Sequence, residues 1–191
     1  PKLARILPGY RTAFGTWYIK SPNSSTNTTP LHQDPSLTAE PHTLGFGIWC
    51  PLLDVDPGNG CLHVVKGSHK LNAQPRPVYQ FSPFPYNDDI ATLVTDHYLT
   101  HIPRKAGQAI LYDKRLFHGA TANPTVAERV AFTCLICPES QPTHFVYRSN
   151  SDSQTVGIYE VQDDFYNRYI LSEKPHGDGV KFIGTEDYTY D

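Results

Sequence analysis

The pattern that most constrains the fold of this chain is His32-Gln33-Asp34, followed 84 positions after Asp34 by His118. In a β-strand, residues i and i+2 project to the same face, so His32 and Asp34 can reach one metal ion while Gln33 points away. His118 must then come from another strand that the fold brings alongside, and the interval leaves room for several strands. Two imidazoles and one carboxylate are the ligand set of a facial-triad non-haem Fe(II) site, which leaves three coordination positions open. The pattern therefore predicts strands that are distant in sequence and close together around a metal ion.

A candidate anion-binding residue, Arg129, follows eleven positions after the second histidine. A guanidinium group can meet a carboxylate with two parallel hydrogen bonds, and it keeps its charge. If this segment is a strand, Ala131 and Thr133 share the face of Arg129, while the bulkier Val130 and Phe132 face the other way. A face of small residues around one arginine favours a buried pocket residue over an ordinary surface charge.

Short runs rich in β-branched and aromatic residues, separated by turn residues, predict an all-β fold with minor helices. A sandwich or jelly roll fits such a chain better than a parallel α/β sheet. The expected strands lie near residues 12–20, 44–53, 61–65, 98–102, 108–112, 128–137 and 143–148. The segment DPGNG at residues 56–60 is a strong turn, and it predicts a hairpin between the second and third of these strands.

The rest of the chain carries weaker patterns. Residues 71–90 hold four prolines with little periodicity and are expected to form a long loop; such loops are often lids or substrate contacts. The Ser/Asn/Thr-rich stretch 21–29 is a second lid candidate. Apolar residues at three- to four-residue intervals predict one short helix within 159–171. The C-terminal tail, 172–191, shows no clear pattern.

Length and charge indicate one domain and exclude some partners. The 191 residues fit a single β-rich domain spanning 1–191. The net charge is −3 and no basic run occurs, so nucleic acid is not an expected partner. No apolar stretch approaches the ~20 residues that a membrane span requires, and no signal peptide is visible. The chain begins at Pro1 and contains no Met, so it is expected to lack an N-terminal portion.

The cysteines favour a reducing compartment. Cys134 and Cys137 have C-x-x-C spacing, but in a strand their thiols point to opposite faces. No second pair with zinc-like spacing accompanies them, so all four cysteines are interpreted as small buried residues. These observations predict a cytoplasmic protein, and they leave the oligomeric state open.

Several ordered segments together resemble the phytanoyl-CoA dioxygenase family of Fe(II)/2-oxoglutarate-dependent oxygenases. They run from about residue 12 to residue 137 and are PLHQDP at 30–35, WCPLLD at 49–54, NGCLHVVKGSHK at 59–70, GQAILY at 107–112 and LFHGA at 116–120, with Asn123 and Arg129 beyond them. The resemblance implies a double-stranded β-helix, the jelly-roll (cupin-like) barrel. It also implies Fe(II) as cofactor, with 2-oxoglutarate and O₂ as cosubstrates.

The resemblance assigns roles to particular residues. It implies His32, Asp34 and His118 as iron ligands and Arg129 as the partner of the distal carboxylate of 2-oxoglutarate. Trp49 lies where the family often has a tryptophan lining the cosubstrate pocket, although core packing explains a tryptophan there equally well. The family commonly has a hydroxyl residue two places after the distal histidine, where this chain has alanine. Thr121 is the next hydroxyl along and is the candidate to replace it.

The implied reaction is hydroxylation of an unactivated C–H bond of a small-molecule metabolite, with release of succinate and CO₂. Relatives that transfer halide lack the carboxylate ligand, so Asp34 favours hydroxylation, with desaturation or ring closure as variants. Two alternatives stay open: a non-oxidative metal-dependent cupin-type enzyme, and a catalytically silent binding protein on the same scaffold. Candidate substrate contacts lie in or near the expected loops, and they are Gln33, Tyr79, Phe81, Phe84, Tyr86 and Arg104.

Overall fold

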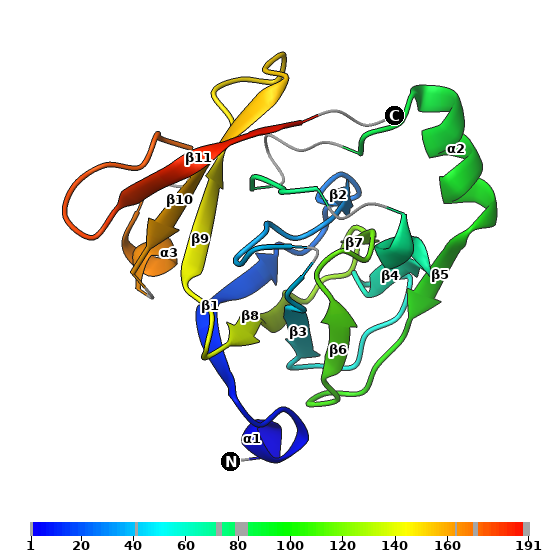
Figure 1. Ribbon diagram of the computed structural model, residues 1–191. Coiled ribbons are helices and arrows are strands. Elements are labelled where there is room, and N and C mark those ends of the chain that lie inside the picture. Colours follow the sequence, from blue (N-terminus) through cyan, green and yellow to red (C-terminus); the bar gives the residue numbers. More distant parts are fainter. Residues whose placement is uncertain are drawn as a thin grey trace.

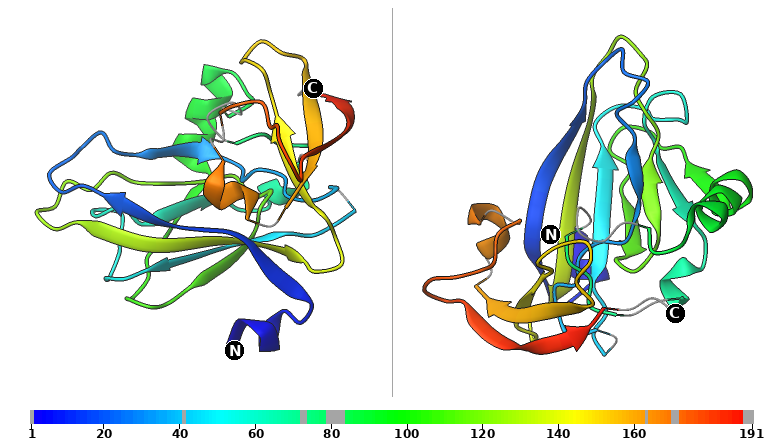
Figure 2. Two further views of the ribbon diagram at one scale, coloured as in Figure 1. Left: turned by 90° about the vertical axis from the view of Figure 1, so that its left-hand side faces the viewer. Right: turned by 90° about the horizontal axis from the view of Figure 1, so that it is seen from above.

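The computed structural model of the chain describes residues 2–40, 42–71, 74–78, 84–162, 164–169 and 172–188. Two four-stranded antiparallel sheets face each other and form the body of the molecule (Figures 1 and 2). The first sheet has the order β1-β8-β3-β6, with bounds Tyr10–Lys20, Arg129–Pro138, Phe46–Pro51 and Ile110–Asp113. The second has the order β2-β7-β4-β5, with bounds Thr29–His32, His118–Ala120, Leu62–Val65 and Leu99–Ile102.

Strands that follow one another in the chain mostly lie in opposite sheets, since β1, β3, β6 and β8 belong to the first sheet and β2, β4, β5 and β7 to the second. This arrangement is the jelly-roll, or double-stranded β-helix, barrel. The all-β prediction is therefore confirmed. Alternate side chains are buried in β3 and the first half of β8 of the first sheet and in β4 of the second, so the inner faces of both sheets contribute to the interior.

A third sheet extends the barrel at one end. Its order is β11-β10-β9, with bounds Lys181–Asp187, Thr155–Val161 and Thr143–Tyr147. The short helix α3 (Phe165–Arg168) lies beside this sheet and packs two aromatic residues into a core cluster that also contains Ala13 and Leu135. The cluster joins the third sheet to β1 and β8 of the barrel.

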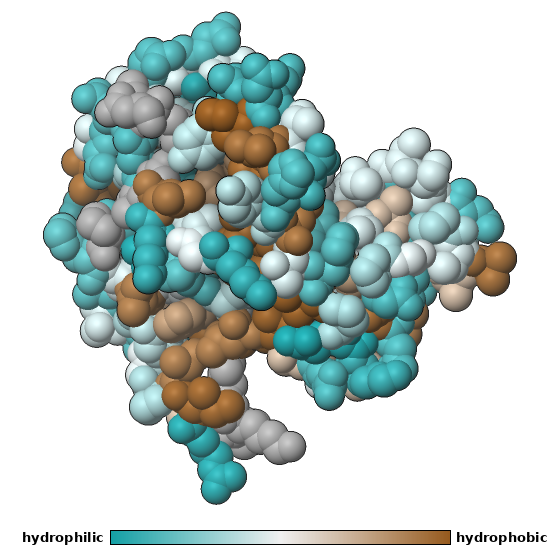
Figure 3. Space-filling view, turned by 90° about the vertical axis from the view of Figure 1, so that its right-hand side faces the viewer, coloured by the Kyte–Doolittle hydropathy of each residue, from teal (hydrophilic) through white to brown (hydrophobic). Residues whose placement is uncertain are grey.

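Helices are few in the described part of the chain: α1 (Lys2–Ile6), α2 (Asp88–His97), α3 and one 3₁₀ turn (Ser68–Lys70). Asn87 caps α2 by accepting a hydrogen bond from the Ile90 amide, and two aspartates in the first turn suit the positive end of the helix dipole. No residue of α2 is buried. On the face that carries α2, hydrophobic residues lie in patches among hydrophilic ones (Figure 3). No helix in the described ranges combines the length and apolar character that a membrane span requires.

Several sequence expectations are wrong. The turn at residues 56–60 exists, but it joins β3 to β4 in different sheets, so no hairpin forms. Residues 155–161 form a strand, because pairing with β9 and β11 overrides a weak helical periodicity. Of the helix expected within 159–171, only the four residues of α3 are helical. The expected loop 71–90 ends at the start of α2. The tail 172–191 contains β11, which completes the third sheet.

Candidate metal centre

Three buried side chains meet at the centre of the barrel. His32 ends β2 and His118 begins β7, and the two residues are direct partners in the antiparallel ladder. Their ring centroids lie 4.4 Å apart. Asp34 completes the group, and one ligand atom from each residue lies within 4.8 Å of the other two. The structure thus brings together the three residues that the sequence pattern singled out.

Asp34 reaches the group from outside the strand, contrary to the expectation that it shares a strand with His32. β2 ends at His32, and Pro35, which follows Asp34, has no amide hydrogen to donate to a ladder. The Asp34 amide instead donates to the Lys114 carbonyl oxygen at 3.0 Å. The carboxylate therefore approaches the histidines from a segment anchored by tertiary contacts.

Both histidines use the same local contact to orient their rings. Nδ1 of His32 lies 2.7 Å from the carbonyl oxygen of Pro30, and Nδ1 of His118 lies 2.9 Å from that of Leu116. A carbonyl can only accept, so each Nδ1 carries the proton and each Nε2 is the acceptor nitrogen. Nε2 of His118 lies 3.8 Å from Oδ1 of Asp34.

The electrostatics of the group suit a cation. Burial and the nearby His118 lower the pKa of His32 to about 4, although Asp34 opposes the shift. His32 is therefore a neutral imidazole near pH 7, which is the metal-binding form. Oδ2 of Asp34 is buried and has no hydrogen-bond partner among the described residues. A buried carboxylate oxygen without a partner is costly, and a bound cation would satisfy it.

These three residues open into a cavity of about 240 Å³ between the two sheets. Its wall is mostly apolar and aromatic, as is typical of a small-molecule site. The lining residues come from both sheets and from the loops. Among them are Phe14, Tyr18, Trp49, Val78, Tyr112, Ala120, Arg129, Thr133 and Tyr166.

Arg129 lies in the cavity wall, at the first position of β8, and is 2% exposed. Its guanidinium carbon lies 5.6 Å from the centre of the Trp49 ring, a cation–π contact. Its Nη1 donates to the Tyr18 carbonyl oxygen at 3.3 Å, and its Nε is buried without a hydrogen-bond partner in the described chain. Burial lowers the pKa of Arg129 to about 10, so the group stays charged at neutral pH. Arg129 and Trp49 thus form a flat, positively charged wall.

Other residues singled out by sequence lie elsewhere. Ala120 lines the cavity and Thr121 does not, although the Thr121 hydroxyl is buried without a partner among the described residues. Gln33 is buried against the Arg115 carbonyl oxygen. Phe84 and Tyr86 pack on Phe117, and Arg104 continues the edge of the second sheet, so none of these lines the cavity. Tyr79 and Phe81 lie outside the described residues.

Sequence reasoning missed Tyr112. It lies on the inner face of β6, and its hydroxyl is 3.5 Å from Nε2 of His118. Burial raises the pKa of this phenol well above 10, and the charge of Asp34 raises it further, so Tyr112 keeps its proton. A neutral phenol at this position can donate a hydrogen bond to groups at the metal centre. In the structure Tyr112 is buried between an exposed and a half-buried neighbour, but the sequence of β6, ILYD, has no alternation that would single it out.

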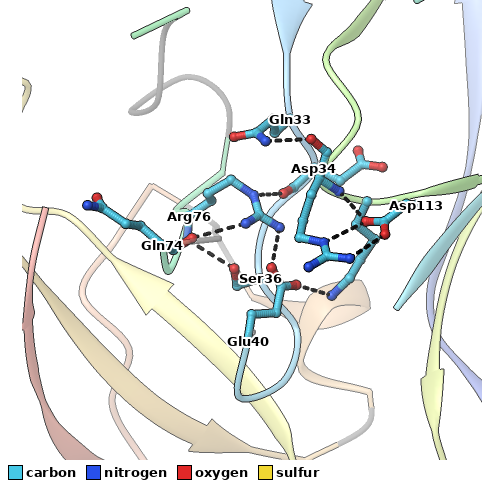
Figure 4. Close-up of polar contacts among 9 residues, drawn as sticks. Gln33, Asp34, Ser36, Glu40, Gln74, Arg76 and Asp113 are labelled. Carbon is cyan, nitrogen blue, oxygen red and sulfur yellow. Dashed lines mark hydrogen bonds and ion pairs between the residues drawn. The ribbon is translucent and has the colours of Figure 1, made fainter. Parts of the chain in front are cut away.

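A buried ion cluster holds the segment that carries Asp34 (Figure 4). Glu40 forms ion pairs with Arg76 at 2.6 Å and with Lys114 at 2.9 Å, and all three side chains are at most 2% exposed. Nε of Arg76 donates to the Asp34 carbonyl oxygen at 2.9 Å. Ser36 adds two further hydrogen bonds to the backbone of Arg76. The cluster therefore ties the metal-centre loop to residues 74–78 and to the end of β6.

Fold and site together define a class, a jelly-roll protein with two histidines and one carboxylate converging in a central cavity. The profile of the family described as Phytanoyl-CoA dioxygenase (PhyH) matches residues 4–131. The chain belongs to the phytanoyl-CoA dioxygenase family.

Curated relatives carry the same family name. The peroxisomal phytanoyl-CoA dioxygenase of Mus musculus is 25% identical over 188 residues, which cover 95% of this chain and 51% of the mouse protein. The Rattus norvegicus protein of that name is 29% identical over 120 residues, which cover 60% of this chain and 36% of the rat protein. The chain thus spans about half the length of the mouse relative and about a third of the rat one.

Solved structures share the fold. EctD from S. alaskensis, in its apoform, matches 71% of this chain and 47% of its own, with a TM-score of 0.57 and 21% identity. The non-haem alpha-ketoglutarate-dependent carbocyclase SnoK matches 92% of this chain and 62% of its own, with a TM-score of 0.57 and 20% identity. EvdO2 from Micromonospora carbonacea var. aurantiaca, complexed with 2-oxoglutarate, matches 68% of this chain and 52% of its own, with a TM-score of 0.53 and 23% identity.

Proposed function

We propose that the protein is an Fe(II)- and 2-oxoglutarate-dependent dioxygenase that hydroxylates an unactivated C–H bond of a small-molecule metabolite. His32, Asp34 and His118 would hold the iron, and Arg129 would hold the distal carboxylate of 2-oxoglutarate. The observation that carries the proposal is the convergence of these three ligand atoms within 4.8 Å in a cavity whose wall also contains Arg129. Residues 1–191 would act as one domain.

The residues fit the metal ion. Two neutral imidazole nitrogens and one carboxylate suit Fe(II), and their number leaves coordination positions for a chelating cosubstrate and O₂. The carbonyl contacts at both Nδ1 atoms hold the rings in the orientation that ligation requires. The unpartnered Oδ2 of Asp34 is the structural observation that most directly calls for a cation.

The cavity fits the cosubstrate. A dicarboxylate needs one permanent cation at the end away from the metal, and Arg129 supplies it with a planar fork of donors. Trp49 orients the guanidinium by stacking on it, and this contact also shields it from water. When bound, Fe(II) with 2-oxoglutarate and O₂ supplies an oxidant that converts C–H to C–OH as 2-oxoglutarate becomes succinate and CO₂.

The protein's own contribution is orientation and exclusion of water. Phe14, Tyr18 and Tyr166 form an apolar and aromatic wall that keeps a reactive centre away from solvent. Tyr112 stays protonated and can donate a hydrogen bond at the metal centre. No cluster of lysines and arginines in the sequence would hold the phosphates of a CoA thioester, so we propose a small polar metabolite or natural product as substrate.

Turnover of the cosubstrate tests the proposal. Purified protein with Fe(II) and 2-oxoglutarate should form succinate in air above the background of free iron, and should form none without O₂. The Asp34→Ala variant should lie at background. Activity that persists without O₂ or 2-oxoglutarate would favour a non-oxidative cupin-type enzyme instead. No succinate under any condition, in a protein that binds iron, would favour a silent binding protein.

A further inference from the structure

Lys20 and Arg129 lie side by side at one end of the barrel. They are direct partners in the antiparallel pairing of β1 with β8, so their side chains leave the sheet on the same face. On β1 this face also carries Tyr18, two residues before Lys20, and Phe14, six residues before it, and both line the cavity. Lys20 is 6% exposed. A second buried cation therefore flanks the arginine of the candidate cosubstrate site.

The two side chains lie against one backbone position, Gly60. A Cβ atom placed there would lie 3.0 Å from Cδ of Lys20 and 3.2 Å from Nε of Arg129. Gly60 also has φ of +93°, a conformation that favours glycine. This glycine lets both cationic side chains close in on the same end of the cavity.

Neither cation has a carboxylate partner among the described residues. Lys20 donates through Nζ to the Asn27 carbonyl oxygen, and Arg129 donates through Nη1 to that of Tyr18. Burial, together with the neighbouring charge of Arg129, lowers the pKa of Lys20 to about 8. Two adjacent buried cations without an anion are unfavourable, so this end of the barrel is suited to a bound anion.

We propose that Lys20 is the second positive charge of the cosubstrate anchor, acting beside Arg129 on the distal carboxylate of 2-oxoglutarate. The inference rests on the proposed function. Lys20 does not itself line the cavity, so its contribution is the positive field at this end of it. That field distinguishes a dicarboxylate from a 2-oxo acid that lacks the distal carboxylate.

Calorimetric titration of the Fe(II)-loaded protein under anaerobic conditions tests the proposal. Lys20→Met should weaken binding of 2-oxoglutarate by about tenfold, because a buried positive charge near the distal carboxylate is lost although no direct contact is removed. Lys20→Arg, which keeps the charge, should restore much of the affinity. Lys66→Met, at an exposed lysine after β4, is the matched control and should bind like the wild type. With 2-oxobutyrate, which lacks the distal carboxylate, all four proteins should bind alike.

The dependence on pH gives a second readout. In the wild type, affinity for 2-oxoglutarate should fall as the pH rises above about 8, because Lys20 loses its proton there. Three titratable groups lie near Lys20 and Arg129: His63, Cys61 and Tyr18, which shares the face of Lys20 on β1. The pKa of His63 is lowered to about 4, and burial raises the pKa of the Cys61 thiol above 9. The decline should be absent in Lys20→Met.

The outcomes separate the two proposals. If wild type and Lys20→Met bind 2-oxoglutarate equally, or if Lys20→Met weakens 2-oxobutyrate to the same extent, Lys20 is not part of the anchor and only this inference fails. If the wild type does not bind 2-oxoglutarate at all, the proposed function fails with it.

Discussion

At the scale of single residues, each histidine of the metal centre is oriented by a backbone carbonyl two positions earlier. The contacts from His32 to Pro30 and from His118 to Leu116 need no distant partner, so both ring orientations are set by the local chain. Asp34 differs, because its position depends on Arg76 and Lys114. The carboxylate is therefore the ligand whose placement depends most on the rest of the fold.

Replacing Asp34 tests its role as a ligand. Asp34→Ala should weaken Fe(II) binding on the order of a hundredfold or more, since even the loss of a residue that only orients a ligand costs roughly 10–100-fold. Succinate formation should fall to background. The exposed Asp96→Ala at the end of α2 is the control and should retain both properties. Affinity and turnover that survive in Asp34→Ala would contradict the ligand assignment.

The buried Glu40 should be essential for stability. Glu40→Gln leaves Arg76 and Lys114 buried without a counter-charge, and breaking a buried ion pair from one side costs about 3–5 kcal/mol of unfolding free energy. Asp54→Asn removes the exposed pair with Lys105 and should change stability little. Urea unfolding of the three proteins measures the difference. Equal losses of unfolding free energy in both variants would show that the buried cluster stabilises the protein no more than the exposed ion pair does.

At the scale of secondary-structure elements, the site depends on a close approach between β3 and β6. Gly47 and Tyr112 are direct partners in this pairing, and the Tyr112 ring lies over the glycine. A Cβ atom at Gly47 would lie 2.2 Å from the Tyr112 ring. The absent side chain at residue 47 is what lets the Tyr112 hydroxyl reach His118.

Gly47→Ala should therefore destabilise the protein by about 1–3 kcal/mol, the usual cost of overpacking a well-packed interior. Gly15→Ala is the matched control, because Gly15 lies in β1 of the same sheet and its added Cβ would meet the Phe132 ring at 3.4 Å, an ordinary contact. Thermal unfolding compares the two variants. If they lose equal stability, the contact between Gly47 and Tyr112 is not the cause.

Elements with strong local patterns could be predicted from sequence, and those that depend on partners could not. β1 and β8 are long and rich in β-branched or aromatic residues, and both lie where expected. β2 has only four residues, one of them Pro30, and it exists because β7 pairs with it. β10 was mistaken for part of a helix because its apolar spacing is ambiguous and its two partner strands decide its conformation.

The candidate site was partly predictable for a similar reason. The order and spacing of four residues match a known set of metal ligands followed by a cation, and the structure brings these residues to one cavity. They are His32, Asp34, His118 and Arg129. Tyr112 and Lys20 stand in no such pattern. Their positions depend on register between strands, namely β6 with β3 and β1 with β8, and register is not visible in a single sequence.

At the scale of the whole molecule, the site exists only when the two sheets face each other. The histidines come from β2 and β7 of the second sheet, whereas Trp49, Tyr112 and Arg129 come from β3, β6 and β8 of the first. The histidines of the candidate metal centre and Arg129 therefore come from the two sheets that face each other (Figure 2). Any change that separates the layers should remove cosubstrate binding before it removes secondary structure.

Stability of the metal-free protein should depend on pH through His63. Burial, together with the neighbouring His101, His118 and Lys20, lowers the pKa of His63 from 6.5 to about 4. The unfolded chain thus binds more protons than the folded one between these values, so stability that is fully present above pH 6.5 is lost as the pH falls toward 4. Unfolding curves at several pH values should show a shallower decline in His63→Gln. An unchanged slope would contradict this account.

The most direct test of the central claim is an anaerobic titration of the Fe(II)-loaded protein with 2-oxoglutarate, followed by its visible absorption. A cosubstrate chelated to iron gives a weak charge-transfer band. The band should appear in the wild type, should be absent in Asp34→Ala, and in Arg129→Ala should require much higher 2-oxoglutarate concentrations. Iron-loaded wild-type protein that shows no band at any 2-oxoglutarate concentration would contradict the assignment of this cavity as an Fe(II)/2-oxoglutarate site.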